Sequence, residues 1–183
     1  MKKNRSYSYV GPEEIIAKMD TQFEGYKITT SKDIQKWIVS TKQVNTNQRI
    51  IATFIINEQE ELVISDRHSE HVFCAGGKKV LSAGEITFCF DDKEIYVSEI
   101  SNQSTGYCPK PNSWQVVEIV LDTLNIEYPP YFTSAFKFRH CEHCQSNNLI
   151  KEDIFVCAVC DTTLDLEWNF DKITKSKQKN HST

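Results

Sequence analysis

The sequence predicts an α+β fold: N-terminal helices, an antiparallel β-meander with a covering helix, and a small cysteine-rich unit at the C-terminal end. Four observations predict this organisation. Apolar residues recur at helical spacing in the first 45 residues, at a period of two from Arg49 to Ile100, and at helical spacing again after Ser113. Four of the seven cysteines then form two CxxC pairs.

The composition limits the class of protein. A chain of 183 residues suggests one domain plus an appendage. With 39% hydrophobic and 25% charged residues it can build a core, and no apolar run reaches the roughly 18 residues that cross a bilayer. The net charge of −4 gives no support to nucleic-acid binding, and no apolar stretch follows the basic first residues. We therefore expect a cytoplasmic protein without nucleic-acid or membrane partners.

Two helices are expected in the first 45 residues. Pro12 suits the first turn of a helix, and Glu13 and Glu14 suit the positive end of its dipole. Ser31 marks the start of the second helix. The expected buried residues are Ile15, Ile16 and Met19 in the first helix, and Ile34, Trp37 and Ile38 in the second.

Consecutive strands joined by short turns are expected between residues 49 and 100, which predicts the meander. The strand at 50–56 is apolar on both faces and should be central. Gly76-Gly77 lies between the apolar segments 71–75 and 80–81 and predicts a two-residue hairpin. Further strands are expected at 62–64, 86–90 and 95–100.

The covering helix is expected at 113–126, capped by Ser113, with Trp114, Val117, Leu121 and Leu124 as its apolar stripe. Pro129-Pro130 then marks a boundary. The expected units are an α+β domain (1–130), the cysteine-rich unit (131–170) and a disordered basic tail (171–183).

The two CxxC pairs have the spacing of a zinc ribbon. Cys141 and Cys144 are followed, after 12 intervening residues, by Cys157 and Cys160. Four thiolates satisfy tetrahedral Zn²⁺, and two pairs at hairpin tips would close the site, so we expect structural Zn²⁺. Iron in place of zinc is an alternative, and so are four unrelated buried or redox cysteines. The turns also lack the Pro and Gly that are usual in zinc ribbons.

The surroundings of the cysteines bear on partners. His140 and His143 are interpreted as flanking residues, because four cysteines leave no vacant position. Residues 137–183 carry seven basic and seven acidic side chains, and four of the basic ones lie in the tail. This balance favours a protein partner, or simple stabilisation of the C-terminal part, over nucleic acid.

His68, Glu85 and Tyr107 are the candidate catalytic residues. An imidazole, a carboxylate and a phenol brought together by a sheet could perform acid–base chemistry. Each also has an ordinary interpretation, as a turn residue, an exposed sheet residue and a packing residue. The other cysteines, Cys74, Cys89 and Cys108, lack the partners of a thiol nucleophile.

Residues 68–109 resemble the core module of plant IQ-motif calmodulin-binding proteins and related microbial proteins. His68-Ser69 matches the opening pair of the module, Gly76-Gly77 a turn, Gly84 a second turn, and Tyr107 and Pro109 the end. Thr105 and Gly106 stand where the family has Gly and His. The resemblance implies a fold more than an activity, and without an IQ motif it does not imply calmodulin binding.

The sequence thus predicts a zinc-ribbon binding or adaptor protein that engages a protein partner through its sheet–loop surface or its ribbon. The alternative is a small transferase or hydrolase of a toxin or defence type, acting on a nucleotide-like substrate through the three candidate residues. The sequence does not indicate an oligomeric state.

Overall fold

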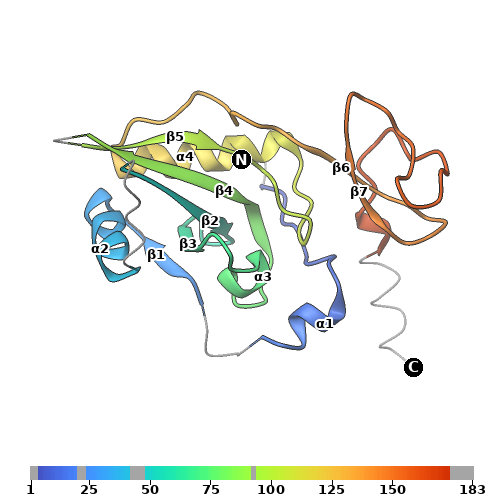
Figure 1. Cartoon of the computed structure of the whole chain (residues 1–183), viewed down its shortest axis with the longest axis horizontal. Coiled ribbons are helices and arrows are strands. Elements are labelled where there is room, and N and C mark those ends of the chain that lie inside the picture. Colours follow the sequence, from blue (N-terminus) through green and yellow to red (C-terminus); the bar gives the residue numbers. More distant parts are fainter. Residues whose placement is uncertain (1–3, 20–23, 42–47, 92–93, 174–183) are drawn as a thin grey trace.

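A five-stranded antiparallel sheet in the order β1-β3-β2-β4-β5 forms the centre of the protein (Figure 1). This computed structural model describes residues 4–19, 24–41, 48–91 and 94–173. The strands of the sheet are β1 (Tyr26–Ile28), β2 (Arg49–Asn57), β3 (Leu62–Asp66), β4 (Val80–Phe90) and β5 (Ile95–Ile100). The helices are α1 (Glu13–Ile16), α2 (Ser31–Thr41), α3 (His71–Cys74), the 3₁₀ turn η1 (Pro111–Ser113) and α4 (Trp114–Leu124), and a hairpin of β6 (Lys137–His140) and β7 (Asn147–Ile150) follows.

β2 is the middle strand, as predicted from its two apolar faces. It pairs with β3 on one side and β4 on the other. Ala52 and Phe54 contribute to the core beneath α2 and α4, whereas Ile55 faces the opposite core with Val72 of α3 and Tyr107. The sheet is therefore covered on both faces, and little of β2 reaches solvent.

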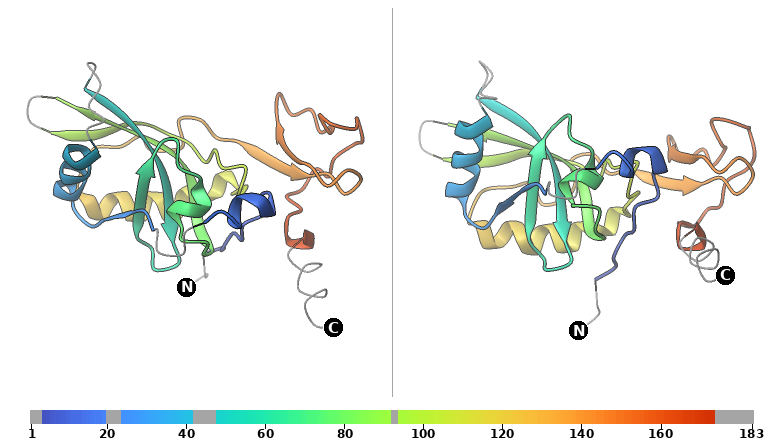
Figure 2. Two further views of the ribbon diagram at one scale, coloured as in Figure 1. Left: turned by 60° about the horizontal axis from the view of Figure 1, so that its bottom comes forward. Right: turned by 90° about the horizontal axis from the view of Figure 1, so that it is seen from below.

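α4 confirms the predicted covering helix and packs along one face of the sheet together with α2 (Figure 2). Val117, Leu121 and Leu124 are buried as expected, and Trp114 is half-buried. The side chain of Ser113 does not cap the helix, because its hydroxyl bonds to that of Ser82 on β4 at 3.0 Å.

α2 begins at Ser31 as predicted, and the Asp33 side chain fixes its start. The Asp33 carboxylate accepts hydrogen bonds from the backbone N–H groups of Thr29 and Thr30, at 3.2 and 2.9 Å. The bonds from Thr29 and Lys36 hold the pKa of Asp33 far below its usual range. The first predicted helix is shorter than expected: α1 ends at Ile16 and contains no buried residue.

The predicted strand at 71–75 is wrong, because these residues form α3. The two glycines close this helix in a Schellman motif: Gly77 N–H donates to Val72 O and Gly76 N–H to Phe73 O, both at 2.9 Å. Both glycines have positive φ, at 57° and 75°. Gly-Gly is therefore a helix terminus here and not a hairpin turn.

The predicted meander is also wrong in its order. β3 and β4 are separated by α3, and β4 returns to pair with β2. β1 was missed, because its three residues lie in a region where the sequence predicts helix.

Gly84 forms no second turn, since it lies inside β4. A Cβ at Gly84 would come within 1.9 Å of Ser101 O. This backbone crossing, and not a turn, requires glycine.

The segment after the two CxxC pairs attaches the cysteine-rich unit to the sheet domain. The Trp168 indole N–H donates to Cys108 O at 2.8 Å, and its ring packs edge-on against Tyr7. The Arg5 guanidinium lies 4.7 Å and the Lys110 ammonium 5.5 Å from the Trp168 ring centre. The chain before Pro129 and the chain after it thus share a packed interface.

Two further expectations concern membrane-spanning helices and the C-terminal tail. Among the described residues, no helix combines the length and the apolar character needed to cross a membrane. Most of the predicted disordered tail, residues 174–183, lies outside the described residues. Lys172 is described and pairs with Glu142 and Asp165.

Candidate metal centre

The first CxxC pair lies in the turn of the β6–β7 hairpin. Cys141 N–H donates to Ser146 O, and Gln145 N–H donates to Cys141 O, both at 2.9 Å. Gln145 adopts a left-handed conformation with φ 64°. The two bonds bend the backbone tightly, so that both sulfurs of the pair reach one point.

The second pair repeats this geometry. Cys157 N–H donates to Thr162 O at 2.8 Å, and Asp161 N–H donates to Cys157 O at 3.0 Å. Asp161 has φ 57°, and Val156 pairs with Thr163 to close the hairpin. The two turns are thus one motif used twice, C-x-x-C-x-[S/T]. Its left-handed residue is Gln or Asp, where glycine is usual.

The four sulfurs converge as the sequence predicts. The described residues contain one group of metal-ligating side chains, in which the sulfurs of Cys141, Cys144, Cys157 and Cys160 all lie within 4.8 Å of one another. The distance from Cys141 to Cys160 is 3.6 Å and that from Cys144 to Cys157 is 3.5 Å. A Zn–S bond of about 2.3 Å gives sulfur–sulfur edges of about 3.8 Å, whereas a disulfide is about 2.05 Å long. The group fits a tetrahedral ion and contains no disulfide.

Hydroxyl and amide groups surround the sulfurs as a second layer. Ser146 Oγ lies 3.1 Å from Cys144 Sγ and 3.3 Å from Cys157 Sγ, and Val159 N–H donates to Cys157 Sγ at 3.4 Å. Thr162 Oγ1 lies 3.3 Å from Cys160 Sγ. Such donors favour the thiolate form that a metal needs, and they disperse the charge that four thiolates leave on a divalent ion.

The pKa values of two of the thiols show the same tendency. The Ser146 hydroxyl, together with backbone amides, lowers the pKa of Cys157 to about 5. Thr162 lowers the pKa of Cys160. The amide of Cys144 lowers the pKa of Cys141, but burial and the neighbouring thiols outweigh it and raise that pKa to about 11. Four thiolates this close together repel one another unless a cation lies between them.

The two flanking histidines lie outside the sulfur group. Both ring nitrogens of His140 contact side-chain oxygens, Nδ1 that of Asn147 at 3.1 Å and Nε2 that of Gln145 at 3.2 Å. His143 is exposed and lines an open hollow beside Lys172. The tetrathiol group is therefore complete without them.

The candidate catalytic residues occupy different environments. His68 is exposed in the turn after β3, and Glu85 lines a small hollow that includes neither His68 nor Tyr107. Tyr107 is buried, and its hydroxyl donates to Lys78 O at 2.7 Å. Burial raises the pKa of Tyr107, so its proton stays in that hydrogen bond.

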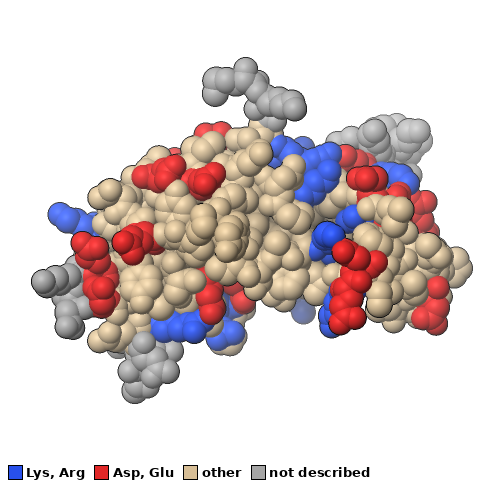
Figure 3. Space-filling model, turned by 90° about the horizontal axis from the view of Figure 1, so that it is seen from above, with Lys and Arg blue, Asp and Glu red and all other residues tan. Residues whose placement is uncertain are grey.

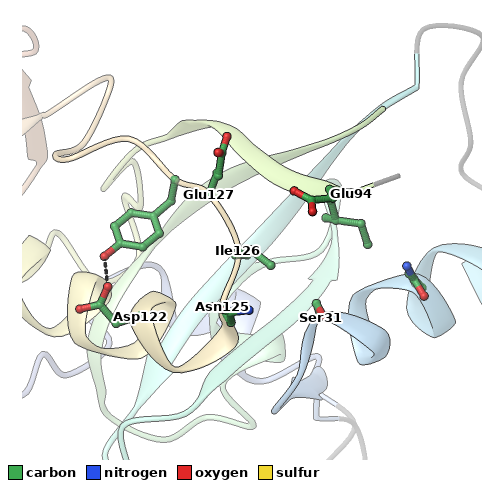
Figure 4. Close-up of a pocket in the computed structure, with 9 residues that line it drawn as sticks. Ser31, Glu94, Asp122, Asn125, Ile126 and Glu127 are labelled. Carbon is green, nitrogen blue, oxygen red and sulfur yellow. Dashed lines mark hydrogen bonds between the residues drawn. The ribbon is translucent and has the colours of Figure 1, made fainter. Parts of the chain in front are cut away.

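A larger hollow of about 560 Å³ lies between the start of α2, the end of α4 and β5 (Figure 4). Glu94, Asp122 and Glu127 contribute carboxylates, and the Tyr128 hydroxyl donates to Asp122. Within the described part of the chain, these carboxylates are not close enough together to form a metal-binding group.

Comparisons with protein-family models, with curated proteins and with solved structures find no match for this chain. The resemblance of residues 68–109 to the IQ-protein module receives no support from them, and its second expected turn, at Gly84, does not form.

Proposed function

We propose that residues 137–170 form a zinc ribbon with one structural Zn²⁺, and that the protein is a binding module that engages another protein through this ribbon. The four cysteines account for the usual four ligands of zinc, so no position remains for water or substrate. Zinc bound there would cross-link the two turns, which have only a small hydrophobic core of their own. The alternative function, that of a transferase or hydrolase, is less well supported, because its three candidate catalytic residues are not grouped in one pocket.

The distribution of exposed apolar side chains carries the protein-binding part of the proposal. The described residues include eight large hydrophobic side chains that are exposed, and four of them belong to the ribbon, which is less than a quarter of the chain. These four are Ile154, Val156, Val159 and Leu166. Exposed apolar side chains that concentrate in one small part of a protein are typical of interaction sites.

The attachment of the ribbon fits this role. Trp168 fixes the ribbon against the sheet domain, and Arg139 donates hydrogen bonds to Asp165 O and Leu166 O. The exposed side chains are thus presented by a pre-organised surface, which lowers the entropy lost on binding.

Native mass spectrometry of the protein purified gently from its own cells tests both parts. We expect one zinc and a stoichiometric protein partner. Val159→Ser should lose the partner and keep the zinc, whereas Val39→Ser should keep both. Val39 on α2 is the matched control, because the two valines are 77% and 71% exposed and Val39 lies far from the ribbon in sequence.

Three outcomes would contradict the proposal. Absence of zinc removes the metal assignment. Partner loss in both valine variants, or in neither, removes the ribbon as the binding surface. One zinc with a retained small molecule and no protein partner would favour the enzyme, with His68, Glu85 and Tyr107 the first residues to mutate.

A further inference from the structure

The ribbon is acidic as well as apolar. Residues 141–167 contain six Asp or Glu and one Lys, although the longer segment 137–183 is balanced. In Figure 3 acidic side chains are visible over the ribbon end of the molecule, and basic ones gather where the ribbon meets the sheet domain. A closed zinc–tetrathiolate centre adds further negative charge.

Part of this acidic charge is already paired. Asp153 binds Lys137 at 2.5 Å, and Glu142 and Asp165 bind Lys172 at 2.5 and 3.5 Å. Glu167 interacts electrostatically with Arg139. Glu152 and Asp161 are exposed and make no ion pair with any residue that the structure describes.

These two carboxylates bracket the exposed apolar residues in sequence. Ile154 and Val156 are both exposed and flank Phe155, which packs with the cysteines. Val159 follows in the CxxC turn. Glu152 precedes this strip by two residues and Asp161 follows it by two.

We propose that residues 152–161 bind a basic amphipathic segment of a partner protein, one that carries branched apolar side chains flanked by Lys or Arg. This inference rests on the proposed protein-binding function and specifies the chemistry of the partner. An apolar partner alone would leave two unpaired carboxylates beside a desolvated interface. A phosphate-bearing partner would meet charge of its own sign.

The test uses the full-length, zinc-loaded protein and two labelled synthetic peptides. One is an amphipathic Leu/Lys peptide, and the other has every Lys replaced by Glu. Fluorescence anisotropy at low and moderate salt measures their affinities. We expect the Lys peptide to bind at least tenfold more tightly than the Glu peptide, and its affinity to fall with salt.

Two double variants locate the binding. Glu152→Gln with Asp161→Asn removes both carboxylates, and Asn tolerates the left-handed backbone at 161. The matched control, Glu94→Gln with Glu127→Gln, removes the same charge from the hollow shown in Figure 4, where neither carboxylate has an ion pair with a described residue. We expect about tenfold weaker binding for the ribbon variant and less than a twofold change for the control, with one zinc retained in both.

Equal losses in the two double variants would show a non-specific attraction to an acidic protein and overturn the inference. So would a Glu peptide that binds as well as the Lys peptide, or self-association that the ribbon variant abolishes, which would make the occupant a second copy of this chain. If the native partner is lost in Val159→Ser but not in the ribbon charge variant, the binding function stands and the basic partner does not.

Discussion

Replacing Trp168 by Ala should destabilise the whole protein by about 3 kcal/mol. The substitution removes the indole hydrogen bond to Cys108 O, worth about 1 kcal/mol. It also removes the edge-on pair with Tyr7, about 1 kcal/mol, and two exposed cation–π contacts from Arg5 and Lys110 at about 0.5 kcal/mol each. Large-to-small aromatic substitutions cost a similar amount.

The assay is thermal unfolding followed by far-ultraviolet circular dichroism, with the zinc content measured on the same samples. For a chain of this length about 3 kcal/mol lowers the Tm by about 9 °C. Trp168→Phe is the matched control, because it keeps the ring contacts and loses the hydrogen bond, at a cost of about 1 kcal/mol.

Two results would contradict this prediction. If Trp168→Ala shifts the Tm by less than about 2 °C, the ring does not join the two parts of the chain energetically. Two separate transitions in the wild type would show that the ribbon and the sheet domain unfold independently.

Three further predictions concern other parts of the molecule. Cys144→Ser and Cys160→Ser should each release zinc, seen by a chelator titration, and lower the Tm; retention of one zinc at unchanged Tm would refute the tetrathiol site. Gly84→Ala should cost about 3 kcal/mol or more in urea unfolding, because its Cβ would lie 1.9 Å from Ser101 O, and a wild-type stability would show that β4 and β5 can separate. Burial lowers the pKa of His71 to about 4, below the usual value of about 6.5. The neutral imidazole should therefore contribute about 3 kcal/mol to the free energy of unfolding above pH 6.5, and this contribution should be lost between pH 6.5 and 4. His71→Gln should flatten this part of the profile of stability against pH, and an unchanged slope would contradict the prediction.

Local patterns were predictable, and contacts between distant residues were not. Each correct prediction rests on a pattern within a short stretch of sequence. These patterns are the apolar residues on both faces of β2, the apolar stripe of α4 and the spacing of the cysteines. The convergence of the four cysteines was therefore the most readily predicted feature. Its internal repeat was also visible, as CEHCQS and CAVCDT, once Gln and Asp are allowed a left-handed backbone.

The failures have a common physical origin. Gly76-Gly77 satisfies a hairpin turn and a Schellman helix end equally well, and tertiary packing of Val72 against the sheet selects the helix. Gly84 lies against Ser101 and Trp168 bonds to Cys108, which are respectively 17 and 60 positions away in sequence. No pattern within a short window carries that information.

The N-terminal segment has a consequence for how the chain completes its fold. Tyr7 pairs with Val80, Val10 O accepts a hydrogen bond from Asn147, and Arg5 binds Asp171. A ribosome therefore releases this segment long before its ribbon contacts exist, and until then only its contacts with the sheet domain can hold it. Until then a protease could cleave it, so chains stopped before Trp168 should be trimmed near residue 10 while full-length protein resists.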